Sequence, residues 1–104
     1  MLGASSQLPS RQVWQRWWYR GTVQGVGFRV TVQSIAATYP VCGFVQNQAD
    51  GGVLVEVKGE IGVLSAFHAA IQQQLAHRIE DVTSTVLSGN DIPKTTETGF
   101  SIRH

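Results

Sequence analysis

The chain has 104 residues, 42% of them hydrophobic, and a formal net charge of +1 at pH 7. This length suits one domain with its own core and is too short for two ordinary domains. The small net charge and the scattered basic residues argue against the broad positive surface that duplex nucleic acid requires, so we expect no nucleic-acid partner.

Cysteine and histidine usage limits the possible chemistry further. Cys42 is the single cysteine, so no disulfide can form within the chain. Neither Cys42 nor the three histidines show the spacing of a metal site. We therefore expect a chain without a metal ion, in a reducing, cytoplasmic compartment.

Residues 1–13 are predicted to form a flexible leader, and residues 14–104 a single domain. The leader is rich in serine and lacks the continuous apolar run of a signal peptide. The aromatic cluster that follows is interrupted by Arg16 and Arg20 and is too short for a membrane span, so we expect no membrane contact.

A strand is predicted over residues 17–23, with Trp17 and Tyr19 on one face and Trp18 and Arg20 on the other. It leads into residues 24–29, which read Gln-Gly-Val-Gly-Phe-Arg and place an arginine at the expected start of a helix.

That arginine has the wrong charge for its position. The N-terminus of a helix is partially positive, so an arginine in the first turn is disfavoured by roughly 0.3–1 kcal/mol unless an anion lies between them. The loop amides and the Arg29 guanidinium would surround a phosphate-sized group. The glycine spacing fits neither a nucleotide P-loop nor a dinucleotide fingerprint. On these residues alone, a tight turn followed by a solvated arginine explains the pattern equally well.

Apolar residues at helical spacing predict a helix that begins at Phe28 and is ended by Pro40. Two β-prone runs at residues 44–47 and 53–58 follow. They flank the turn sequence at residues 50–52, Asp-Gly-Gly, which predicts a hairpin closed by Gly59.

A second amphipathic helix is predicted from Gly62 to about Arg78. Residues 79–87 alternate as a strand, residues 89–99 read as an irregular loop, and residues 100–102 form a short last strand. This order predicts an α+β ferredoxin-like two-layer sandwich, βαββαβ, with an antiparallel sheet and two helices on one face. Because that fold has many functions, the site must decide the activity.

Two segments resemble the acylphosphatase family. They are residues 21–29, Gly-Thr-Val-Gln-Gly-Val-Gly-Phe-Arg, and residues 43–51, Gly-Phe-Val-Gln-Asn-Gln-Ala-Asp-Gly. The resemblance extends from about Trp17 to Ile102. It implies hydrolysis of a carboxyl-phosphate anhydride to a carboxylate and inorganic phosphate, without a metal ion or organic cofactor. We therefore expect a monomeric enzyme whose partners are a small-molecule acyl phosphate and the phosphate product.

The resemblance also implies the roles of individual residues. Arg29 matches the phosphate-binding arginine, and Asn47 matches the asparagine that positions the attacking water. From the local sequence alone, Asn47 is better explained as a polar turn residue, and the resemblance reverses that preference. The phosphate cradle is expected to consist of the backbone amides of Gln24, Gly25, Val26, Gly27 and Phe28.

Three positions depart from the family pattern: Pro40 stands where glycine is frequent, Gln46 where arginine is frequent, and Leu54 where glutamate is frequent. Gln46 and Leu54 are expected to remove charges near the rim of the site and so to affect substrate preference. The alternative function is a non-catalytic ferredoxin-like binding or regulatory module. A single-stranded RNA binder of this kind would need stacking aromatics, and Trp18 is the candidate on the predicted strands.

Overall fold

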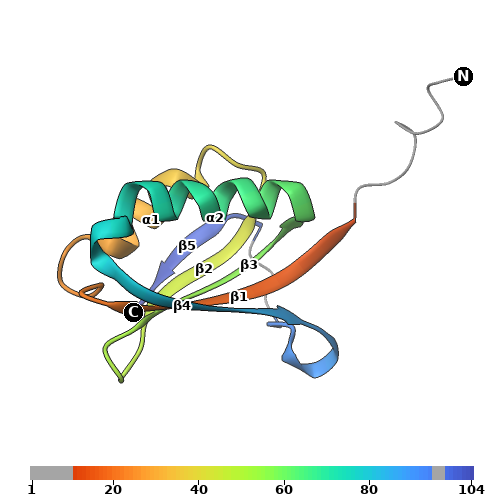
Figure 1. The fold of residues 1–104 in the computed structure, drawn as a ribbon. Coiled ribbons are helices and arrows are strands. Elements are labelled where there is room, and N and C mark those ends of the chain that lie inside the picture. Colours follow the sequence, from red (N-terminus) through yellow and green to blue (C-terminus); the bar gives the residue numbers. More distant parts are fainter. Residues whose placement is uncertain (1–10, 95–97) are drawn as a thin grey trace, which may run out of the picture.

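The computed structural model describes residues 11–94 and 98–104. They form a five-stranded sheet with two α-helices on one face (Figure 1). In chain order the helices and strands are β1 (Gln12–Gly21), α1 (Phe28–Ala36), β2 (Cys42–Asn47), β3 (Val53–Glu60), α2 (Ile61–Leu75), β4 (Ile79–Leu87) and β5 (Phe100–Arg103). Two short 3-10 turns, η2 (Ala76–Arg78) and η3 (Gly89–Asp91), flank β4.

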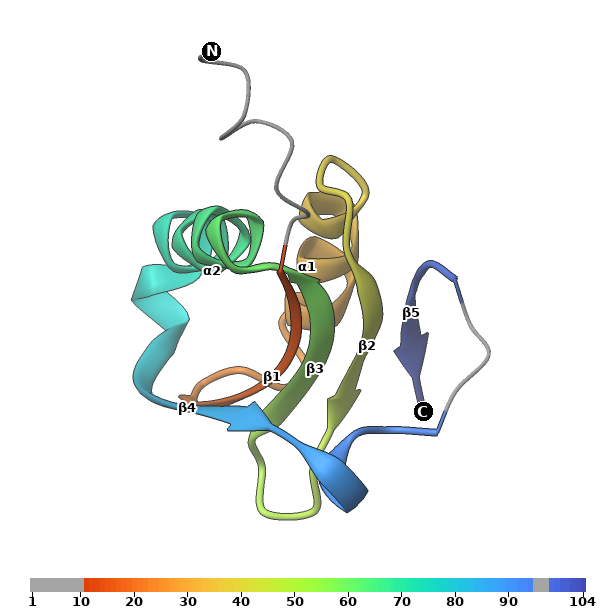
Figure 2. The ribbon, with the colours of Figure 1, turned by 90° about the vertical axis from the view of Figure 1, so that its right-hand side faces the viewer.

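The strand order in the sheet is β4-β1-β3-β2-β5. β1 pairs antiparallel with β3 and β4, and β2 pairs antiparallel with β3, which confirms the predicted βαββαβ sandwich. β5 differs from the expectation because it pairs parallel with β2, so the sheet is mixed. A hairpin cannot join β4 to β5, which lie at opposite edges, and a long connection allows the parallel direction. η3 begins this connection on the side of the sheet away from the helices (Figure 2).

The core lies between the two helices and the sheet face that they cover. The alternation predicted for β3 is confirmed, since Val53, Val55 and Val57 are fully buried there. The predicted helical stripes are confirmed as well, and they supply Phe28, Val32, Ile35, Leu64, Phe67 and Ile71. In the described part of the chain, no helix is long and apolar enough to cross a membrane.

β1 begins at Gln12, earlier than the boundary at residue 14. The reason lies in β3, which continues to Glu60 and pairs with β1 as far as Gln12 opposite Glu60. Gln12 and Val13 therefore belong to the sheet. The expected leader otherwise lies almost entirely outside the described residues.

Gly59 does not close the hairpin, as the sequence suggested, but lies inside β3. A Cβ atom at this position would lie 3.1 Å from side-chain carbons of both Leu64 and Val41. The missing side chain thus permits close packing of α2 and the α1–β2 connection against the strand. The hairpin turn itself is made as expected, with Gly51 at φ 94° and the Gly52 amide donating to Asp50 Oδ1 at 2.9 Å.

A partly buried polar contact joins β1 to α2. The Tyr19 hydroxyl lies 2.9 Å from His68 Nδ1, and the His68 imidazole lies against the Trp17 ring with centroids 4.6 Å apart. Burial raises the pKa of the Tyr19 hydroxyl well above its usual value and lowers the pKa of His68. Both groups are therefore neutral at neutral pH.

The lowered pKa of His68 predicts acid sensitivity of the fold. The unfolded chain binds a proton at a higher pH than the folded chain, so the free energy of unfolding falls as the pH drops below about 6.5 and levels off below the folded-state pKa. Denaturant unfolding between pH 8 and pH 5 measures this slope. We expect a shallower slope in His68→Gln and an unchanged one in Gln73→Ala, which removes an exposed side chain of α2 that carries no titratable group. Equal slopes in all three proteins would contradict the assignment.

Candidate active site

The loop between β1 and α1 takes its shape from two glycines. Gly25 has φ 75° and Gly27 has φ 78°, backbone conformations that residues other than glycine rarely adopt. Gly27 is the N-cap of α1, and its carbonyl accepts from the Thr31 amide at 3.0 Å. No side chain caps the helix, and its first turn contains no acidic residue. The positive end of the α1 dipole is thus left without a negative partner from its own turn.

The backbone N–H groups of residues 24–30 donate to no acceptor within the part of the chain that the structure describes. A Cβ added at Gly25 or Gly27 would meet no atom within 4 Å, so the loop surface is open at both glycines. Several unpaired donors next to a helix N-terminus form an arrangement that binds anions.

Arg29 lies in the first turn of α1 and is half-buried. Its Nη1 donates to the Arg103 carbonyl at 3.2 Å and lies 3.3 Å from His104 Nδ1. The carbonyl oxygen partly offsets the unfavourable cation at the helix N-terminus and holds one side of the guanidinium. This contribution of β5 was missed by sequence reasoning, because no local pattern connects residues 74 positions apart.

Asn47 is the last residue of β2, opposite Val53 of β3. It lines a small cavity of about 110 Å³ together with Arg29. The remaining lining residues are Val23, Gly25, Gly27, Phe28 and Val30. The structure therefore brings the two predicted catalytic side chains and both loop glycines to one cavity.

Two residues of the predicted cradle do not line this cavity. Val26 packs against the core. The Gln24 side chain instead connects the loop to the hairpin, because its Nε2 donates to the carbonyls of Gln48 at 2.7 Å and Gly52 at 2.8 Å. Gln24 therefore holds the loop beside the end of β2, where Asn47 lies.

Substitution of Gln24 by alanine is expected to destabilise the fold by about 1–2 kcal/mol, the contribution of two neutral hydrogen bonds. The cost stays moderate because each carbonyl keeps a second hydrogen-bond donor. The Gly51 amide donates to the Gln48 carbonyl, and the Gln48 amide donates to the Gly52 carbonyl. Denaturant unfolding measures the loss, with the exposed Gln73→Ala on α2 as the matched control. A Gln24→Ala protein as stable as the control would show that the side-chain bridge contributes nothing.

Two residues that depart from the family pattern, Gln46 and Leu54, do not lie at the rim of the site, contrary to expectation. Gln46 and Leu54 are opposite each other across β2 and β3. Successive side chains of a strand point to opposite faces, so both residues face away from the sheet side that carries Asn47 and Val53. They therefore do not form the rim of the cavity. Pro40 follows α1, which already ends at Ala36.

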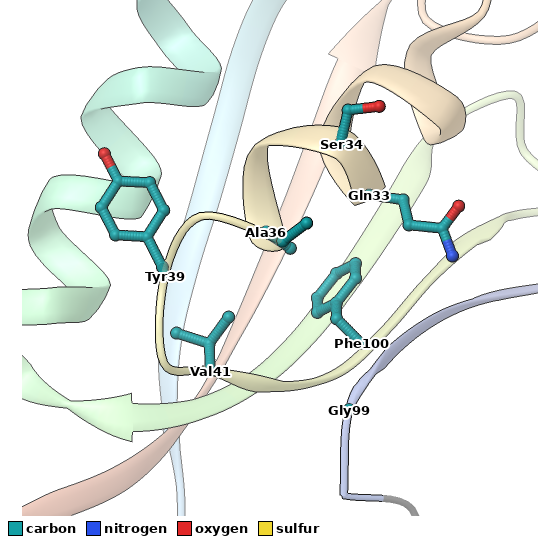
Figure 3. Close-up of a pocket in the computed structure, with 8 residues that line it drawn as sticks. Gln33, Ser34, Ala36, Tyr39, Val41, Gly99 and Phe100 are labelled. Atoms are coloured by element: carbon teal, nitrogen blue, oxygen red, sulfur yellow. The ribbon is translucent and has the colours of Figure 1, made fainter.

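A larger cavity of about 550 Å³ lies at the other end of α1 and shares no lining residue with the small one. Its walls include Gln33 and Ala36 of α1, Tyr39 and Val41 after the helix, and Phe100 of β5 (Figure 3). No charged side chain lines it, so it offers no cation to a phosphate. Within the described residues, no three histidine, cysteine or acidic side chains are grouped to hold a metal ion.

Comparison with known proteins identifies the family. The chain matches the family model described as acylphosphatase over residues 15–102. An acylphosphatase of Ligilactobacillus salivarius is 38% identical over 84 residues, which cover 81% of this chain and 90% of that protein. The crystal structure of acylphosphatase from Bacillus subtilis superposes with a TM-score of 0.74 at 28% identity, covering 88% of this chain and 99% of that one.

A similar domain also occurs within a larger protein. Carbamoyltransferase HypF of Rhodobacter capsulatus is 39% identical over 85 residues, which are 80% of this chain and 10% of HypF. The acylphosphatase of Ligilactobacillus salivarius matches over most of both chains, and the family model covers nearly all of the sheet and both helices. The chain therefore belongs to the acylphosphatase family and is a hydrolase of acyl phosphates.

Proposed function

We propose that the chain hydrolyses acyl phosphates without a metal ion, with the loop amides and Arg29 binding the phosphoryl group and Asn47 positioning the attacking water. The observation that carries this proposal is the single cavity lined by Arg29, Asn47 and both loop glycines. Its volume of about 110 Å³ suits a small tetrahedral anion. Sites for larger ligands typically measure about 300–1,000 Å³.

In the proposed mechanism the Arg29 guanidinium and the loop amides bind different oxygens of the phosphoryl group. The guanidinium stays protonated at any working pH and can hold two oxygens at once, while the unpaired amides and the α1 dipole stabilise negative charge on the others. Charge that develops on these oxygens as the bond to the acyl oxygen stretches meets donors that are already in place. This arrangement lowers the barrier without a conformational change.

Because the leaving group is a carboxylate, the reaction needs little acid or base catalysis. A bond forms between the water oxygen and phosphorus, the bond from phosphorus to the acyl oxygen breaks, and the electron pair leaves with a carboxylate, which is a weak base. The proton lost by the water passes to solvent or product. Because little acid or base help is needed, the Asn47 carboxamide has to orient the water rather than remove its proton.

A single assay tests the proposal. The purified native chain is incubated with acetyl phosphate, with and without an excess of chelator, and inorganic phosphate is measured. We expect release in both conditions. Activity that is lost with the chelator and restored by added metal would overturn metal independence. Salt-dependent binding of single-stranded RNA with no hydrolysis would favour the alternative of a non-catalytic binding module.

The assembly and location of the enzyme are part of the same proposal. We propose a monomer in the cytoplasm that meets a small-molecule acyl phosphate, since Arg29, Asn47 and the loop amides all come from this chain in the proposed mechanism and Cys42 is a free thiol. Sedimentation of the purified chain tests the monomer, and a dimer at micromolar concentration would contradict it.

A further inference from the structure

A row of three rings leads from α2 to the phosphate loop. The imidazole of His68 contacts the Tyr19 hydroxyl at 2.9 Å, and the Tyr19 ring packs on Phe28 with centroids 5.4 Å apart. Tyr19 and Phe28 are both essentially fully buried. Phe28 is the first residue of α1 and directly precedes Arg29. Its position therefore affects both a cradle amide and the guanidinium.

The direction of the hydrogen bond follows from what each group has available. No other acceptor for the Tyr19 hydroxyl lies within hydrogen-bond distance in the described ranges. If Nδ1 of His68 carried the proton, the hydroxyl would accept and its own hydrogen would be buried without a partner. The hydroxyl therefore donates to an unprotonated Nδ1, and the imidazole proton lies on Nε2.

We propose that Tyr19 and His68 are positioning residues of the phosphate site, with their hydrogen bond holding the Tyr19 ring against Phe28 and so fixing the start of α1. This inference rests on the proposed function, because it concerns the same cavity. Neither residue lines that cavity, so both act through Phe28.

Removal of one partner should harm the site more than removal of both. In His68→Leu the hydroxyl of Tyr19 is left buried without an acceptor, and it can be satisfied only if the ring moves away from its place against Phe28. In the double variant Tyr19→Phe with His68→Leu the orphaned hydroxyl is gone, and an apolar pair replaces the polar one. A pair of this kind can be close to neutral.

The test compares the native chain, His68→Leu, the double variant and Ile71→Val. Ile71 is buried on the same helix and lines neither the cavity nor the ring row, so Ile71→Val controls for a general loss of stability. Each protein is measured for kcat and KM with acetyl phosphate, for inorganic phosphate binding, and for the phosphate-induced shifts of the Phe28 and Arg29 amides by NMR.

We expect kcat to fall by about threefold to tenfold in His68→Leu, with weaker phosphate binding and altered amide shifts, on the scale of one orphaned polar group. The double variant should return to within about twofold of the native kcat, and Ile71→Val should keep it. A His68→Leu protein with native kcat and native phosphate binding would overturn the inference, as would a double variant worse than His68→Leu. A native chain that neither binds phosphate nor hydrolyses acetyl phosphate would instead overturn the proposed function and this inference together.

Discussion

Replacement of Arg29 by alanine is expected to remove most of the phosphate affinity and to lower kcat/KM for an acyl phosphate by about 10³-fold, the scale of a cation that contacts a transferring phosphoryl group. Arg29 is the charged side chain that lines the cavity, and the Arg103 carbonyl holds its Nη1. Arg29→Lys keeps the charge but loses the planar fork, so we expect it to recover a small part of the activity. Phosphate-release kinetics and calorimetric titration with inorganic phosphate measure both effects.

The control for Arg29 is Arg20→Ala. Arg20 lies on β1, where its side chain contacts Thr83 and Asp81, outside the cavity. We expect native kinetics from this variant. The fold should tolerate Arg29→Ala, because loss of one hydrogen bond to a carbonyl is offset by removal of a cation from a helix N-terminus. Equal activity in the folded Arg29→Ala and Arg20→Ala proteins would contradict the role of Arg29, and an unfolded Arg29→Ala protein would contradict the expected tolerance of the fold.

Asn47→Ala should separate catalysis from binding. We expect kcat to fall by about 10²-fold, as for the loss of one preorganised hydrogen-bonding group, while the inhibition constant of inorganic phosphate changes by less than about threefold. The reason is that Asn47 contacts the water in the proposed mechanism, whereas the amides and Arg29 hold the phosphate. Steady-state kinetics with phosphate as a competitive inhibitor measure both quantities in one experiment.

Asn90→Ala serves as the matched control, because Asn90 is an exposed asparagine on η3. It should behave like the native chain. Parallel losses of turnover and phosphate affinity in Asn47→Ala would assign Asn47 to binding, and no loss at all would remove it from the mechanism.

Local sequence patterns predicted most of the elements, because each is determined by residues close together in the chain. The apolar stripe at Phe28 and Val32 fixed the buried face of α1, and Gly51 marked the turn between β2 and β3. Residues 24–29 also predicted a loop with available amides before α1, and Gly25 and Gly27 adopt positive φ there, which glycine does without strain. The expectation that Arg29 and Asn47 share one site came from the predicted fold and the resemblance to the family, because the local sequence alone favoured a turn residue at Asn47.

Contacts between distant residues could not be predicted in this way. The parallel pairing of β5 with β2 depends on the path of the connection between opposite edges of the sheet, which leaves no periodic signal. The bridge from Gln24 to the hairpin spans 24 and 28 positions, and the sequence indicated a backbone role for this residue instead. Gln46 and Leu54 are a different case: alternation along each strand already places them on the opposite face from their neighbours Asn47 and Val53, and the expectation of a rim position did not take this into account.

The contact of Arg29 with the Arg103 carbonyl joins the second element of the chain to its last strand. Closing a loop of this length is entropically costly and comes late when local contacts form first. During refolding, affinity for phosphate should therefore emerge only as the edge strand docks. Conversely, bound phosphate should slow hydrogen exchange in that strand, because a ligand stabilises the conformation that binds it.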